Sequence, residues 1–161
     1  MRTALLFLTL MLNLLHLAAA QERVQYLPDQ RLTPGVSLRV SKDDLCNSGY
    51  TSPADKLTVA VKRQVFDRYG ISPNALGYNV DHLIPVSLGG TNSLKNLWPQ
   101  PLSGKWNYHM KNTLEKRLRK MVCSGELELE KAQREIAADW VSAYTKYGII
   151  KPNSRLRITL N

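Results

Sequence analysis

The residues of this chain best suited to chemistry are Asp81 and His82, at the centre of the segment 79–85, Asn-Val-Asp-His-Leu-Ile-Pro. A neutral imidazole can take up a proton near neutral pH, and a carboxylate is an oxygen ligand that hard divalent cations prefer. Adjacent side chains on a strand point to opposite faces of the sheet. The pair therefore serves one site only if the strand bends or bulges here. The alternative is a half-buried histidine on a hairpin, beside a solvated carboxylate.

The neighbouring residues narrow the interpretation, because further motifs follow the Asp-His pair in order ahead of a predicted helix. Pro85 comes first, then Gly89-Gly90, and then Asn-Leu-Trp-Pro-Gln at 96–100. This order resembles the HNH family of nucleases, the ββα-metal fold, in which a hairpin and one helix hold a divalent cation. More narrowly, the chain is similar to a group of exported bacterial HNH-type proteins over most of its length. The residues outside the core motif that carry this narrower resemblance are Cys46, Gly49, Tyr50 and Cys123.

The resemblance implies a role for each residue of the motif. His82 matches the general base that deprotonates a water molecule for attack on a phosphodiester, and Asp81 matches the carboxylate that binds the metal. Asn96 matches the middle asparagine, which fixes the hairpin and orients the histidine. The sequence departs from the family at the third metal ligand, because no His or Asn stands at the usual spacing beyond Asn96. The candidates for this ligand are Asn107 and His109.

Helical geometry distinguishes these two candidates. If the helix already runs at Asn107, that side chain lies about 20° from Leu114 and faces the fold, whereas His109 lies about 140° away and faces outward. This geometry favours Asn107. If the helix begins later, His109 becomes the better candidate. For either residue the alternative is an ordinary side chain at the start of a helix.

The donor set expected around the cation suits magnesium, with manganese as an alternative. Mg²⁺ binds through few protein oxygens and keeps several waters, so one carboxylate and one amide suffice, whereas zinc requires more nitrogen or sulfur ligands. The resemblance therefore implies a divalent-metal-dependent endonuclease with low sequence specificity, acting on DNA and with RNA left open. The alternative function is a catalytically weak or inactive module of the same fold that binds nucleic acid or an anionic envelope component.

The charge of the chain supports a polyanionic partner. Its 22 basic residues against 13 acidic ones give a formal net charge of +9, which favours nucleic acid, anionic lipid or sulfated sugar. Basic residues concentrate on the helix predicted over residues 105–122, where they form either a nucleic-acid-binding face or an ordinary solvated face. The residues predicted to contact nucleic acid are Lys105, Lys111, Lys116, Arg119 and Lys120.

The pattern of apolar residues predicts a mainly helical α+β fold of ββα type with additional helices. A strand is expected over 77–85, a turn at Gly89-Gly90 and a returning strand from 91. Helices are expected over 105–122 and 128–147, each with one apolar stripe. The predicted nuclease domain covers 46–148, preceded by an extended arm over 21–45 and followed by a basic tail over 149–161.

Residues 1–20 resemble a signal peptide, with Arg2 before an apolar run that ends in Ala18-Ala19-Ala20. Cleavage after Ala20 predicts a secreted or periplasmic protein without a stable membrane anchor, and the alternative is an uncleaved anchor. The chain has two cysteines, Cys46 and Cys123, and an even number is typical of disulfide-bonded proteins in an oxidising compartment. They predict one disulfide, with two buried thiols as the alternative.

Overall fold

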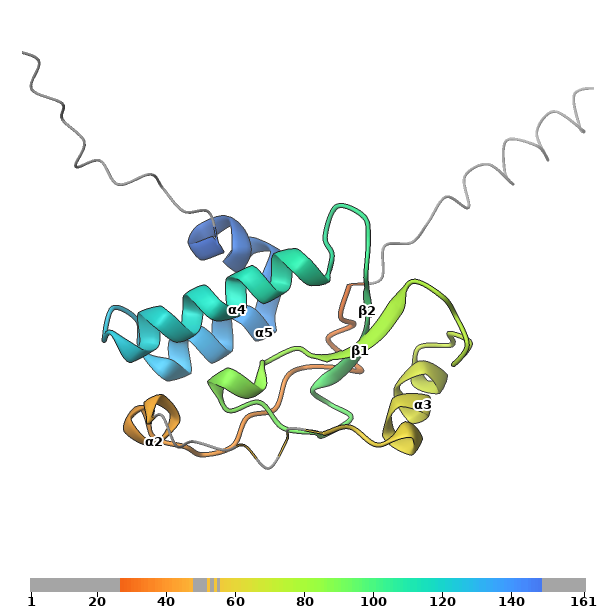
Figure 1. Ribbon diagram of the computed structural model, residues 1–161, viewed down its shortest axis with the longest axis horizontal. Helices are drawn as coiled ribbons and strands as arrows, with labels where there is room; N and C mark the ends of the chain where they lie inside the picture. The colour runs from red at the N-terminus through yellow and green to blue at the C-terminus, as the bar shows by residue number, and fades with distance from the viewer. Residues whose placement is uncertain (1–26, 48–51, 53, 55, 149–161) are drawn as a thin grey trace, which may run out of the picture.

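A computed structural model describes residues 27–47, 52, 54 and 56–148 of the chain (Figure 1). It has an α+β architecture dominated by helices, with one two-stranded antiparallel sheet, and this confirms the predicted α+β, mainly helical class. None of the helices in these ranges is long and apolar enough to cross a bilayer. In chain order the elements are α2 (Lys42–Cys46), α3 (Val59–Arg68), β1 (Tyr78–His82), the 3₁₀ turn η1 (Val86–Leu88), β2 (Leu97–Pro101), α4 (Tyr108–Cys123), α5 (Leu129–Ala143) and the π-helical turn η2 (Tyr144–Gly148).

The sheet pairs β1 with β2 in one continuous register, from Tyr78 opposite Pro101 to His82 opposite Leu97. The second strand starts later than expected, because Gly89 ends η1 and does not join the two strands. Residues between the strands form a long loop. The register is unbroken at the Asp-His pair, so β1 has no bulge there and ends at His82.

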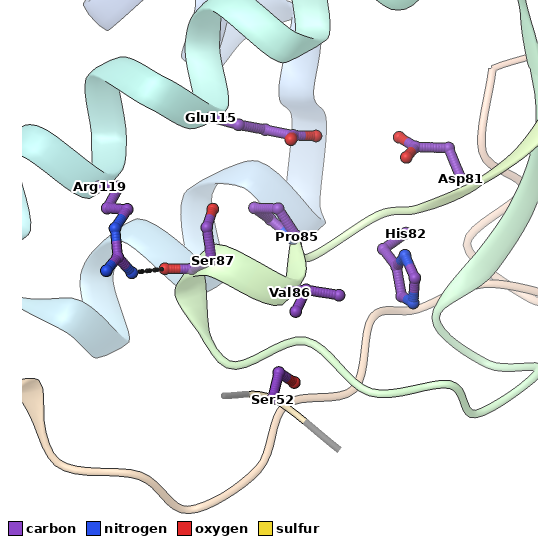
Figure 2. A pocket seen from close by; sticks show the side chains of 8 residues that line it. All are labelled: Ser52, Asp81, His82, Pro85, Val86, Ser87, Glu115 and Arg119. Carbon is purple, nitrogen blue, oxygen red and sulfur yellow. Dashed lines mark hydrogen bonds between the residues drawn. The ribbon is translucent and has the colours of Figure 1, made fainter. Parts of the chain in front are cut away.

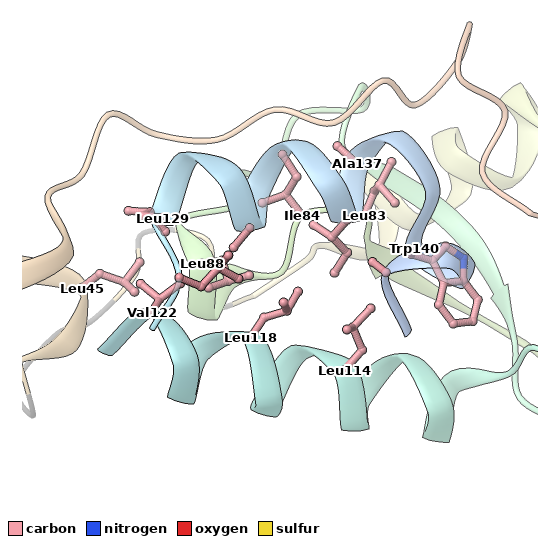
Figure 3. Close-up of a cluster of buried hydrophobic side chains, with 14 of the residues drawn as sticks. Leu45, Leu83, Ile84, Leu88, Leu114, Leu118, Val122, Leu129, Ala137 and Trp140 are labelled. Carbon is pink, nitrogen blue, oxygen red and sulfur yellow. The ribbon is translucent and has the colours of Figure 1, made fainter. Parts of the chain in front are cut away.

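The main core lies between α4 and α5, which run side by side (Figures 1 and 3). Leu114 and Leu118 of α4 are fully buried and belong to the same cluster as Ile136 and Trp140 of α5. These residues recur at helical spacing, so burying one face of each helix accounts for the pairing. The helix expected over 128–147 is interrupted, because the backbone at Asp139 leaves helical geometry and the last turn is η2.

Strand β2 is buried on both of its faces and joins two hydrophobic clusters. Trp98 belongs to the main core, whereas its neighbour Leu97 packs with Val65 and Phe66 of α3. Adjacent side chains of a strand point to opposite faces, so a short two-stranded sheet is held from both sides. This double burial fixes the end of β1, where the Asp-His pair stands.

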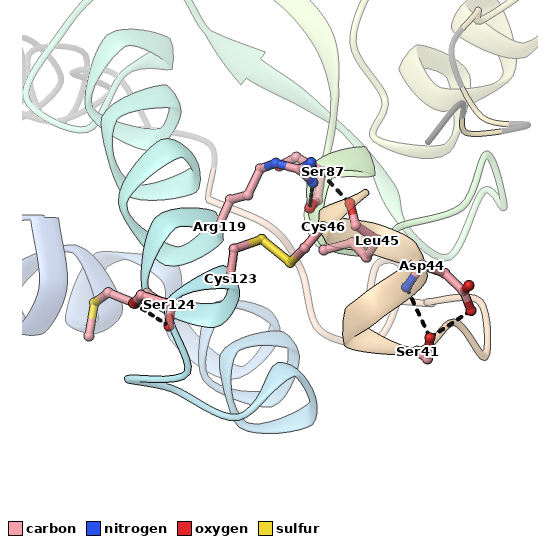
Figure 4. Close-up of a disulfide and its surroundings, with 9 residues drawn as sticks. Ser41, Asp44, Leu45, Cys46, Ser87, Arg119, Cys123 and Ser124 are labelled. Atoms are coloured by element: carbon pink, nitrogen blue, oxygen red, sulfur yellow. Dashed lines mark hydrogen bonds between the residues drawn. A yellow bond between two sulfur atoms is a disulfide. The ribbon is translucent and has the colours of Figure 1, made fainter. Parts of the chain in front are cut away.

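A disulfide joins Cys46 at the end of α2 to Cys123 at the end of α4, as predicted (Figure 4). Arg119 adds a second connection, since its guanidinium donates to the backbone oxygens of Leu45 and Ser87, each at 3.0 Å. The bridge closes a loop of 77 residues, and chain-entropy arguments assign such a loop about 4 kcal/mol. The disulfide and the two hydrogen bonds of Arg119 together connect α2 and η1 to α4.

The segment expected to form an extended arm follows the domain closely. Thr33 Oγ1 donates to the backbone oxygen of Leu97 at 2.9 Å, and Ser37 forms a bridge with Gly90. The end of this segment is helical, since α2 begins at Lys42. The predicted signal peptide over 1–20, the basic tail over 149–161, and Gly49 and Tyr50 lie outside the described residues.

Candidate functional site

An open cavity of about 420 Å³ lies at the end of β1, between η1 and α4 (Figure 2). Asp81 and His82 both border it although their side chains leave the strand on opposite sides. They can do so because the cavity lies where the strand ends and the chain turns into η1. The residues that line it are Ser52, Asp81, His82, Pro85, Val86, Ser87, Glu115 and Arg119.

Asn96 closes the loop that follows His82. It is fully buried, and its Oδ1 accepts from the backbone nitrogens of Ile84 at 2.9 Å and Val36 at 3.3 Å. Its Nδ2 donates to the backbone oxygens of Ile84 at 3.0 Å and Thr91 at 2.9 Å. These four contacts use the full capacity of the amide, so Asn96 holds the loop in place. It makes no hydrogen bond to His82.

Gly90 is required at the same point of the loop. A Cβ atom there would lie 1.8 Å from the backbone oxygen of Ile84, well inside van der Waals contact. The loop closes this tightly because the backbone nitrogen of Gly90 donates to the backbone oxygen of Pro85 at 2.9 Å. The second glycine of the Gly-Gly pair therefore serves close packing.

The residue that orients His82 is Asn92, which the sequence analysis missed. Asn92 Oδ1 lies 2.8 Å from His82 Nε2, and its Nδ2 donates to the backbone oxygen of Lys56 at 3.3 Å. Because an amide oxygen only accepts, His82 Nε2 carries the proton in this contact. The other ring nitrogen, Nδ1, is then the basic one, and it makes no hydrogen bond to any described residue.

Lys111 contacts the site from inside the protein, contrary to the prediction that it contacts nucleic acid. Its side chain is 0 % exposed, and Nζ donates to Asp81 Oδ2 at 2.8 Å, to the backbone oxygen of His82 at 2.6 Å and to Glu115 Oε1. Burial alone lowers the pKa of Lys111, but the charges of Asp81 and Glu115 outweigh it, so this pKa lies above its ordinary value. Lys111 is therefore a protonated interior cation.

Glu115 is a second site residue that the sequence analysis missed. It stands one helical turn after Lys111 on α4 and shares the ammonium with Asp81. The two carboxylate side chains are 19 % and 25 % exposed, respectively, so both keep a partly open side toward the cavity. Burial raises the pKa of Glu115, and the charge of Lys111 only partly opposes this effect.

Neither candidate for the third metal ligand borders the cavity. Helix α4 begins at Tyr108 and Asn107 is its N-cap, so the condition that favoured Asn107 is not met. Asn107 Oδ1 accepts from the backbone nitrogens of His109 and Met110, and its Nδ2 donates to the backbone oxygen of Gly104. His109 is exposed, and its ring lies 5.3 Å from that of Tyr108.

The donors around Asp81 do not fit a resident divalent cation. Within the described ranges, no group of three or more His, Cys, Asp or Glu side chains is arranged to hold a metal. Asp81 already binds the ammonium of Lys111, and the amide of Asn107 is used in capping. The cation next to Asp81 is thus a lysine of the chain itself.

The other predicted phosphate contacts fall into two groups. Lys105, Lys116 and Lys120 are exposed, the last two on α4. Arg119 is half-buried, borders the cavity and is held by two backbone oxygens. Arg119 therefore borders the same cavity as His82, whereas the three lysines lie on the surface.

Comparison with known proteins adds no assignment: no protein-family model, curated protein or solved structure matches this chain.

Proposed function

We propose that this chain is an exported nuclease of HNH type that hydrolyses phosphodiester bonds of DNA with little sequence preference, with RNA as a second substrate class. The observation that carries the proposal is the cavity shared by His82 and Arg119. It combines a base of defined tautomer with a guanidinium, and phosphodiester hydrolysis needs both a base and a positive charge.

His82 supplies the base. Its Nδ1 takes a proton from a water molecule while the water oxygen attacks phosphorus, and the bond from phosphorus to the leaving oxygen breaks. The leaving oxygen then takes a proton from solvent. Asn92 holds the ring by Nε2 at 2.8 Å, which keeps Nδ1 available for this transfer.

Arg119 supplies the charge. Its guanidinium is held by Leu45 and Ser87, and its remaining N–H groups can face a phosphate in the cavity. Lys116 and Lys120, exposed on the same helix, extend the positive surface beyond the cavity. Contacts of this kind bind the sugar-phosphate backbone of nucleic acid and carry no base preference.

Export rests on the signal-like residues 1–20 and on the disulfide. Structural disulfides persist in oxidising compartments and are rare in the cytosol. The proposed location is therefore the periplasm or the extracellular space, where nucleic acid from other cells is the available substrate.

The proposal is tested by incubating the mature, oxidised protein with supercoiled plasmid and with RNA, in Mg²⁺, in Mn²⁺ and in EDTA. We expect nicking by the wild type and none by His82→Ala. The matched control is His109→Ala, which removes the other described histidine and, because His109 lies outside the cavity, retains cleavage. A wild type that cuts neither substrate in any of these conditions contradicts the proposal.

The ion pair between Asp81 and Lys111 favours a second candidate, a module of this fold that binds nucleic acid without cutting it. A carboxylate neutralised by a buried ammonium is a weaker ligand for a metal. This candidate predicts DNA binding whose logarithmic affinity falls linearly with the logarithm of salt concentration and which His82→Ala leaves unchanged. Tight binding without cleavage selects it.

A further inference from the structure

Lys111 is the feature of the site that the proposed hydrolysis leaves unexplained. Its ammonium contacts one oxygen of Asp81, one of Glu115 and the backbone oxygen of His82. These oxygens come from β1 and α4, the two elements between which the resemblance places a metal ion. We infer that the Lys111 ammonium takes the place of that ion and that the free protein binds no divalent cation at Asp81.

The geometry of the contact supports this assignment. A lysine ammonium has three N–H donors, and the three oxygens around Nζ match that number. The lysine side chain is 0 % exposed, so water does not compete for these donors. All three donors of the ammonium are therefore used, and each of the three oxygens has a partner without any added ion.

Charge gives a second, independent argument. A divalent cation held by Asp81 would lie close to the Lys111 ammonium, which is 2.8 Å from Asp81 Oδ2. Two positive charges at such a separation repel strongly in a half-buried site. The ion and the ammonium therefore exclude each other, and the ammonium is covalently part of the chain.

Neither of the two residues predicted as the third ligand is available to a metal ion at Asp81. The amide of Asn107 is engaged at the start of α4, and His109 is on the surface, away from the cavity. Mg²⁺ binds proteins through few oxygens, usually those of one or two carboxylates. Next to Asp81, Glu115 Oε1 and the backbone oxygen of His82 already accept from Lys111.

Manganese binding tests the inference directly. The mature, oxidised protein is titrated with Mn²⁺, and the free ion is followed by electron paramagnetic resonance. We expect the free-ion signal of buffer to be retained in the presence of wild-type protein. Stoichiometric loss of that signal with wild type, reversed by Asp81→Asn, overturns the inference.

Two substitutions of Lys111 sharpen the test. Lys111→Ala removes the ammonium and leaves space beside the two carboxylates, so this variant is expected to bind Mn²⁺ and to gain thermal stability from it. Lys111→Met removes the charge but fills the space, and is the matched control without Mn²⁺ binding. A folded Lys111→Ala protein that does not bind Mn²⁺ contradicts the inference.

The titration of wild-type protein tests whether Mn²⁺ binds at Asp81 even if both variants fail to fold. None of these measurements depends on cleavage, so the inference and the proposed nuclease activity succeed or fail separately. In the cleavage assay the inference adds one expectation, which is that nicking persists in EDTA.

Discussion

His82 Nε2 lies 2.8 Å from Asn92 Oδ1, and this contact determines which nitrogen of the imidazole is basic. Asn92 is itself held by the backbone oxygen of Lys56, so its orientation is fixed from the far side of the ring. The loop between the strands thus supplies the residue that orients the imidazole ring, while β1 supplies His82 itself.

Replacing Asn92 tests this relationship. Asn92→Leu keeps the size of the side chain but removes the acceptor, so the ring of His82 loses its fixed position. We expect the cleavage rate to fall by up to about 10²-fold, the scale of a small misplacement of a reacting group. Rates are compared at saturating DNA with Asn74→Leu, a substitution at an exposed loop position. An unchanged rate in Asn92→Leu shows that the contact does not matter for catalysis.

Asn96 is expected to act on stability. Asn96→Ala leaves four backbone groups of the loop without their partner, and a buried unsatisfied group costs about 1–3 kcal/mol. The free energy of unfolding in urea should therefore fall by at least about 3 kcal/mol. Asn74→Ala is the control and should differ from wild type by less than about 0.5 kcal/mol. An equally small loss in Asn96→Ala refutes the role assigned to this side chain.

The buried ammonium of Lys111 should make the free energy of unfolding depend on pH in the alkaline range. Its pKa in the folded protein lies above the ordinary value of 10.5, so its contribution to stability is fully present below that pH and is lost as the pH rises through the folded-state pKa. Breaking a buried ion pair costs about 3–5 kcal/mol. We therefore expect the free energy of unfolding of Lys111→Met at neutral pH to be lower than that of wild type by this amount.

The measurement is urea unfolding of both proteins from neutral to alkaline pH. The difference between wild type and Lys111→Met should be constant up to about pH 10.5 and then shrink. Burial also raises the pKa of Tyr69, but that residue is present in both proteins and cancels in the difference. A difference that is already lost near neutral pH is incompatible with a raised pKa.

Reduction of the disulfide should destabilise the protein. The Cys46–Cys123 bridge is expected to contribute about 4 kcal/mol, and Cys123 is exposed, so reductant can reach it. Thermal unfolding is followed with and without dithiothreitol. The double variant Cys46→Ser, Cys123→Ser should melt at the lower temperature in both conditions. Identical melting of oxidised and reduced wild type rules out a stabilising bridge.

Much of the fold could be predicted because the relevant signals are periodic. Leu114 and Leu118 recur at helical spacing and do pack inside, and the two cysteines do form a bridge. The returning strand was placed too early because Gly89-Gly90 indicates a turn without showing which elements the turn connects. The actual closure of the loop depends on Asn96, whose side chain contacts Thr91, Ile84 and, from a distant part of the sequence, Val36.

The site was harder to predict. Some of its residues stand in segments without a periodic pattern, and the role of others was inferred from their charge alone. Lys111 lies on the same helical face as Leu114 and Leu118, which indicates burial, but a lysine in a basic helix was expected to be solvated. Asn107 is one of the two predicted candidates for the third ligand, yet asparagine before a helix commonly caps it. Asn92 stands in an irregular loop, where sequence spacing does not show what a side chain faces.

The most direct test of the account is the single-turnover rate of DNA cleavage by wild type, His82→Ala and His109→Ala. Removal of a general base costs about 10²- to 10⁴-fold. We predict a loss of this size for His82→Ala and wild-type rates for His109→Ala, with all three proteins equally folded. Equal rates for His82→Ala and wild type would contradict the assignment of His82 as the base.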